Sequence, residues 1–138
     1  MKALIFSLCF LLYTPYPVEA SQDILLASTA RTATNSTANR VKGLGVKSLH
    51  LILNVTVVPG GDTITPKLVG IDALGIPYDL LVGAAISTTG TTVLKLGQGV
   101  GLLANGSAQD LLPDLYKVTI THSGSGSFTY SLTQNTGN

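Results

Sequence analysis

Cysteine, tryptophan and charge are all scarce in this chain of 138 residues, and each shortage excludes some chemistry. Charged residues make up 11%, against about a quarter in an average domain. The residues that normally coat helices are therefore few, and Ser, Thr, Asn and Gly take their place, which favours strands and turns. The single cysteine, Cys9, lies near the N-terminus, so the rest of the chain has no internal disulfide and no thiolate. Glu19 is the only glutamate.

The charge balance argues against a nucleic-acid partner. The formal net charge is +1 and no basic run is present. Arg31, Arg40, Lys42 and Lys47 form a loose group, whereas a nucleic-acid binder usually shows a basic stripe interleaved with aromatic residues. We therefore expect no nucleic-acid partner, and these four side chains are as compatible with solvated surface as with a binding site.

Residues 1–20 have the three parts of a secretory signal peptide. Lys2 supplies the positive start, residues 3–13 are apolar, and Pro15 and Pro17 end that run before a cleavage site after Ala20. The alternative is an apolar segment that stays attached. The run is too short for a stable membrane span. Residues 21–138 are predicted to form a single domain, which is long enough to bury its own core.

Alternating apolar and polar residues predict the clearest strands. Residues 46–58 alternate with period two, which indicates one buried face. Residues 63–72 follow after a turn, and Pro66 there suggests an edge position or a bulge because proline donates no hydrogen bond to a ladder. The runs 115–122 and 128–132 also alternate, and the small polar turn between them predicts a β-hairpin.

The remaining segments are weaker. Residues 23–28, 78–86 and 92–96 read as short strands, 102–114 allows one helical turn, and 134–138 reads as a polar tail. About seven or eight short strands, with turns roughly every ten residues, indicate an all-β antiparallel sandwich. Both the jelly-roll and the immunoglobulin-like arrangement fit this spacing.

No catalytic, cofactor-binding or metal site is predicted, so we expect a protein that is not an enzyme. His50 is placed on an outward strand face and His122 before a turn, so both are interpreted as solvated. The aspartates beyond Asp23 fall in or beside turns, where they usually cap backbone amides. These are Asp62, Asp72, Asp79, Asp110 and Asp114.

Two further motifs carry little weight. The Gly-x-Gly-x-Gly at 97–101 lacks the dinucleotide-binding spacing and strand–helix context, so it is interpreted as a flexible turn. Three Asn-x-Ser/Thr sequons begin at Asn35, Asn54 and Asn105, and they matter only in a host that glycosylates secreted proteins.

The order of several motifs is similar to that in a group of phage proteins. The motifs are Ala-Ser-Thr-Ala-Arg-Thr at 27–32, Gly-Ile-Asp at 70–72, a Thr/Gly-rich run at 84–94, Tyr-Lys-Val-Thr-Ile-Thr-His at 116–122 and Phe-Thr-Tyr-Ser-Leu at 128–132. From about residue 24 to 132, the chain resembles small all-β proteins encoded among the structural genes of tailed bacteriophages and prophages. The resemblance implies a virion component, a capsid decoration or tail-associated protein, whose partners are itself or other virion proteins. The resemblance defines no functional residues that could be assigned in this chain.

Two localisations follow from these observations, because virion proteins assemble in the cytoplasm and need no signal peptide. The first is the virion. The second is secretion, with the domain acting as a binding or adhesion module for a glycan or cell surface. Such a module usually presents exposed aromatic rings, and Tyr78 beside Pro77 is the best candidate.

Overall fold

The predicted alternation does produce strands. The computed structural model describes residues 21–137, which form ten strands and no helix. The strands are β1 (Gln22–Arg31), β2 (Asn35–Ser36), β3 (Arg40–Val41), β4 (Ser48–Val57), β5 (Ile64–Ile71), β6 (Pro77–Val82), β7 (Gly90–Gly97), β8 (Ser107–Ala108), β9 (Leu115–His122) and β10 (Phe128–Gly137). The predicted signal peptide and Cys9 lie outside the described residues. Within those residues, no helix is long and apolar enough to span a membrane.

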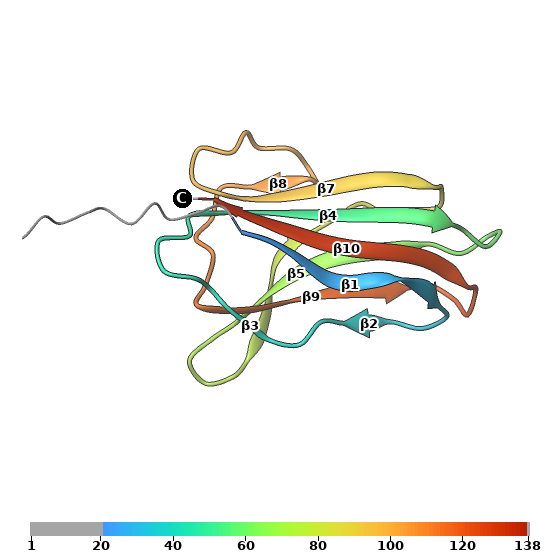
Figure 1. Ribbon diagram of the computed structural model, residues 1–138, viewed down its shortest axis with the longest axis horizontal. Coiled ribbons are helices and arrows are strands. Elements are labelled where there is room, and N and C mark those ends of the chain that lie inside the picture. Colours follow the sequence, from blue (N-terminus) through green and yellow to red (C-terminus); the bar gives the residue numbers. More distant parts are fainter. Residues whose placement is uncertain (1–20, 138) are drawn as a thin grey trace, which may run out of the picture.

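The strands form two sheets that face each other, as Figure 1 shows. The first sheet has the order β1-β10-β4-β7-β8. The second has the order β2-β9-β5-β6, and β3 also pairs with β9. Except for β7 with β8, all the pairs are antiparallel. The predicted antiparallel sandwich is confirmed.

The pairing of the strands is nested along the chain. The innermost pair is β5 with β6, and β4 with β7 encloses it. Next comes β9 with β2 and β3, and β1 with β10 is outermost. Nested antiparallel pairs that fold into two facing sheets are the jelly-roll arrangement. The strand order of this chain differs from that of an immunoglobulin-like sandwich.

The core lies between the sheets and comes from the alternating positions. From the first sheet, Leu49, Leu51, Leu53 and Val55 point inward, together with Phe128, Tyr130 and Leu132 of β10. From the second sheet, Tyr116, Val118 and Ile120 meet them. Full burial stabilises the fold by roughly 1.5–3 kcal/mol for each large apolar side chain.

The predicted hairpin of residues 115–132 is wrong. Strands β9 and β10 belong to different sheets, and the turn between them crosses the sandwich. Both strands bury their apolar faces in one core, but from opposite sides. Period two therefore identified the inward side chains correctly and the partner strand incorrectly.

Three smaller expectations also need correction. Pro66 does not lie on an edge strand, because β5 pairs with β9 on one side and β6 on the other. The alternative, a bulge, is closer to the structure, since the β5–β6 register shifts between Leu68 and Val69. The backbone nitrogen of Pro66, which carries no hydrogen to donate, faces the irregular stretch after β6. There Gly83 N donates a hydrogen bond to Pro66 O. Residues 102–114 contain the short strand β8 and no helical turn. Residue 134 belongs to β10 and is buried, so the polar tail is wrong.

The register places the loops at two distinct ends of the sandwich. Ser48 pairs with both Gly97 and Gly137, and Leu115 pairs with both Val41 and Ile71. Loops 42–47, 72–76 and 98–114 therefore lie at the same end as Ser21 and Gly137. We call this the terminal end (Figure 1). The loops of the opposite end are built largely from small residues such as Ser, Thr and Gly.

Candidate functional site

The two histidines lie in different environments. His50 lies on the outer face of β4, between Asn135 and Lys95 of the neighbouring strands. His122 points inward, with its ring edge-on to Phe128 at 5.3 Å and its Nε2 3.4 Å from the Tyr130 hydroxyl. Its Nδ1 is buried without a hydrogen-bond partner among the described residues. The expected solvent exposure of His122 is therefore wrong.

Burial controls the charge of this histidine. It lowers the pKa of His122 from its ordinary value, and the charge of Arg31 lowers it further, while Asp62 acts in the opposite direction. Burial also raises the pKa of Tyr130, which Arg31 partly offsets. The imidazole is thus held neutral beside a neutral phenol, and its hydrogen-bond partner among residues 21–137 is the Tyr130 hydroxyl and not a carboxylate.

The aspartates have structural partners. Asp72 Oδ1 accepts hydrogen bonds from Leu74 N and Ile76 N, both 2.8 Å long, which is the turn capping that the sequence predicted. Asp110 likewise accepts from Leu111 N. Asp62 instead joins two neighbouring loops, because its Oδ2 accepts from Gly126 N over 2.7 Å, beside the bond from Ser123 N to Thr63 O.

Ion pairs hold most of the remaining charges. Lys67 pairs with Asp79 at 2.9 Å and Lys42 with Asp114 at 3.1 Å. Of the loose basic group, Arg31 lies over the Tyr130 ring and Arg40 pairs with an aspartate, so the four side chains form no common basic patch. Within residues 21–137, Arg31 and Lys47 form no ion pair, and Arg31 instead donates hydrogen bonds to backbone carbonyl oxygens.

A polar network links the two sheets at the terminal end. Asp23 Oδ2 of β1 accepts hydrogen bonds from Arg40 Nη2 over 2.8 Å and from Gln134 Nε2 over 3.1 Å. The Tyr116 hydroxyl donates to Gln134 Oε1 over 3.0 Å. Burial raises the pKa of Tyr116, and its hydrogen bonds and the Arg40 charge oppose that shift. The network satisfies a buried glutamine and fixes the sheets relative to each other.

This network lies beside a cavity of about 270 Å³. Its polar side is formed by the network, and its apolar side by Val41, Leu44 and Val46. Val46 also lines a neighbouring hollow of about 280 Å³ together with Lys47 and Leu111. The two hollows share a wall, so the surface between them is continuous.

Exposed apolar side chains are frequent at this end, and Val41, Leu44 and Leu111 among them line the two hollows. Leu44 is 95% exposed, Leu74 84% and Leu111 68%, although each is a residue type normally buried. We define the apolar end as the seven exposed aliphatic residues of the terminal end: Val41, Leu44, Leu74, Ile76, Leu102, Leu103 and Leu111. The other exposed large hydrophobic residues, Ile24, Val57, Tyr78 and Val93, lie on strands.

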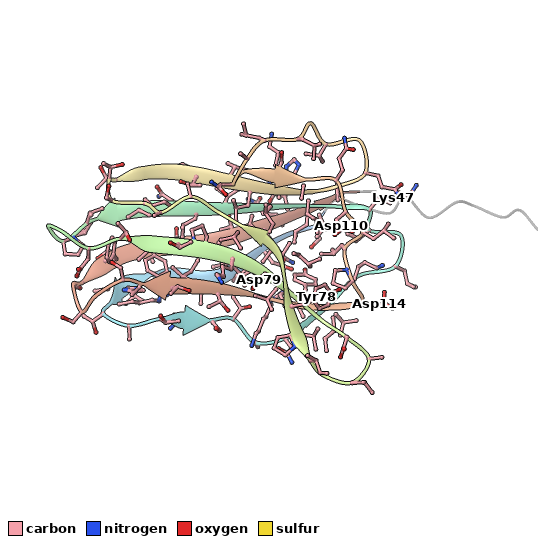
Figure 2. The ribbon with its side chains drawn as sticks, turned by 180° about the vertical axis from the view of Figure 1, so that it is seen from behind. Lys47, Tyr78, Asp79, Asp110 and Asp114 are labelled. Atoms are coloured by element: carbon pink, nitrogen blue, oxygen red, sulfur yellow. The ribbon has the colours of Figure 1, made fainter. Side chains whose placement is uncertain are left out.

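The charges around the apolar end have both signs. Figure 2 shows Lys47, Asp110 and Asp114 near this end of the sandwich, with Tyr78 on β6.

Tyr78 is the one aromatic side chain exposed among the described residues. Its ring lies against Gly70, where a Cβ would approach within 2.5 Å of the ring. The candidate glycan platform therefore has one face covered.

The terminal end presents an apolar surface and few unpaired charges. Within residues 21–137, no cluster of three or more His, Asp or Glu side chains is placed to hold a metal ion. Apart from Lys47, the titratable groups of this end that are described above serve in ion pairs, caps or the network. What remains available is an apolar surface with a mixed rim of charge, which resembles a protein-binding surface.

Comparisons with known proteins give a fold but no family. No family model matches the chain, and no curated protein sequence matches it. A solved structure of infectious bursal disease virus, Gx strain, is similar over 86% of this chain, with 10% sequence identity and a TM-score of 0.53. A structure of the Gt strain covers 85% of this chain with 14% identity and a TM-score of 0.43. The chain spans about a third of the length of those two chains, 32% in each. At such low identity, the similarity to the Gx strain concerns the fold.

Proposed function

We propose that this chain is a non-enzymatic structural protein of a virus-like particle, of the type that decorates a phage capsid or joins a phage tail. The observation that carries the proposal is the shared two-sheet fold with a chain from a virus structure. The motif order of residues 24–132 supports it independently, because it resembles proteins of phage structural genes. Assembly proteins need contact surfaces and no reactive site, which agrees with the partners found for the aspartates and for His122.

The localisation follows from the same proposal. A virion component assembles inside the cell, so we propose that residues 1–20 are not removed as a secretion signal. Mass spectrometry of the intact purified protein tests this point, since cleavage after Ala20 removes the only cysteine of the chain. A mature protein that starts at Ser21 would favour the secreted module instead.

The experiment that tests the function is a search for the chain in particles. Particles made by cells that carry the gene are purified on a density gradient and analysed by mass spectrometry. We expect peptides of residues 21–138 in the particle band, in constant ratio to the main shell protein across the gradient. Peptides found only in the soluble fractions would contradict the proposal. A glycan array tests the alternative module, for which Tyr78→Ala should abolish any binding.

A further inference from the structure

The apolar end holds seven of the eleven exposed large hydrophobic residues among the described residues. Seven aliphatic side chains, from 56% to 95% exposed, lie on three loops and one short strand that project from one end of the sandwich (Figure 1). Soluble monomers rarely expose contiguous apolar patches above a few hundred Å². Val46 lines both hollows at this end, so Leu44 and Leu111 on either side of it belong to one continuous apolar surface. A specific interface buries about 800 Å² on each partner, and this surface supplies its apolar centre.

The charges at this end select the kind of partner. Lys47 and Asp110 are both exposed, and neither forms an ion pair within the part of the chain that the structure describes. A nucleic acid or an anionic membrane would require a predominance of positive charge. Asp72 is exposed at the same end and also has no ion pair within those residues, so the loops of this end have one free cation and two free anions. A two-fold contact can pair Lys47 of each copy with Asp110 of the other, which makes charges of both signs beside an apolar patch self-complementary.

The rest of the described surface contains no matching apolar patch. The four exposed large hydrophobic residues outside the apolar end lie on four different strands. The opposite end has loops rich in Ser, Thr and Gly. A head-to-tail contact needs two different complementary patches, whereas a two-fold contact needs one patch that fits itself. The distribution of apolar residues therefore favours the two-fold contact.

We propose that the apolar end binds a second copy of this chain in a two-fold, end-to-end pair. Leu44 and Leu111 lie at the centre of the contact, on either side of the shared wall at Val46, and Lys47 faces Asp110 of the other copy. This inference goes beyond the proposed function, because the pair forms whether or not the chain enters a particle.

Sedimentation equilibrium of the full chain tests the pair. We expect a dimer, with twice the chain mass of 14.3 kDa. Leu44→Asp and Leu111→Asp should each raise the dimer dissociation constant by about tenfold or more, as expected for the centre of an interface. Val57→Asp is the matched control, since Val57 is an exposed aliphatic residue at the far end of β4, and it should leave the constant unchanged. Circular dichroism verifies that all three variants fold.

A charge exchange identifies the partner as a second copy. Lys47→Asp alone should weaken the pair, and Lys47→Asp combined with Asp110→Lys should restore it, because the exchanged charges meet again across the two-fold axis. A wild-type chain that stays monomeric up to about 1 mM overturns the inference. So does a dimer that is insensitive to Leu44→Asp and Leu111→Asp. A monomeric chain found in purified particles would refute the pair and leave the virion role intact.

Discussion

The hydroxyl of Tyr116 on β9 donates a hydrogen bond of 3.0 Å to Gln134 Oε1 on β10, and this bond joins the two sheets inside the sandwich. Both side chains are buried, with Tyr116 2% and Gln134 4% exposed. Gln134 in turn donates to Asp23, so the bond connects the core to the ion pair at the terminal end. A buried polar network of this kind stabilises the fold only if each of its polar groups has a hydrogen-bond partner.

Tyr116→Phe should destabilise the fold by about 1–2 kcal/mol, because it leaves the buried oxygen of Gln134 without its donor. Urea denaturation followed by circular dichroism measures this loss. Tyr78→Phe is the matched control, since no hydrogen bond of the Tyr78 hydroxyl exists within residues 21–137, and it should change stability by less than about 0.5 kcal/mol. Equal effects of the two substitutions would contradict the assigned role of Gln134.

His122 should make the fold sensitive to mild acid. Its folded-state pKa lies below the ordinary value of 6.5, so the unfolded chain binds the proton first as the pH falls. The stability due to the neutral imidazole is fully present above about pH 6.5 and is lost as the pH falls from there through the lowered folded pKa. The urea concentration at the midpoint of unfolding, measured between about pH 7.5 and 5.5, reports this loss of stability. His122→Gln should flatten this slope and His50→Gln should keep it; equal slopes in wild type and His122→Gln would refute the assignment.

Asp62 should control the turn that crosses between the sheets. Its carboxylate accepts the Gly126 amide over 2.7 Å, and a Cβ at Gly124 would lie 2.3 Å from Asp62 Oδ1, so the loop is closely packed on this side chain. Asp62→Ala should cost about 1–2 kcal/mol and speed hydrogen exchange at Gly126. Asp62→Asn keeps an acceptor oxygen and should lose less than half as much. Unchanged exchange at Gly126 in Asp62→Ala would disprove the contact.

Arg31 should hold the end of the edge strand β1. Its guanidinium donates to the carbonyl oxygens of Tyr130, Ala27 and Thr29 at 2.7, 2.8 and 3.1 Å, and lies 4.5 Å from the Tyr130 ring centre. A lysine cannot supply this planar fork, so Arg31→Lys should cost about 1–2 kcal/mol. Hydrogen exchange should rise in β1 and stay unchanged in β5. An equal rise in both strands would indicate a global effect instead.

The sequence predicted which side chains are buried better than it predicted which strands pair. The inward set on residues 49–55 and 116–132 is correct, because period two depends only on the local backbone. Whether a short polar turn closes a hairpin or crosses to the facing sheet depends on tertiary contacts such as that of Asp62 with Gly126. Those contacts join residues 64 positions apart and leave no local pattern.

The terminal end was the part of the structure that the sequence predicted least well. Gln134 continues the inward series of Phe128, Tyr130 and Leu132, so the same alternation extended by two residues would have placed it inside. The apolar end had no comparable pattern, because its seven residues come from separate segments that only the fold brings together. Of the three tyrosines of the domain, Tyr78 was named as the best candidate for an exposed ring and is exposed, whereas Gly70 beneath its ring was not anticipated.

The central claim is that this domain acts as a structural unit of a particle, and electron cryomicroscopy of purified particles tests it most directly. The account predicts density for a sandwich of two five-stranded sheets at symmetry-related positions, with the apolar end covered by another protein surface. A particle map that is fully explained by other chains, with no density for this sandwich, would contradict it.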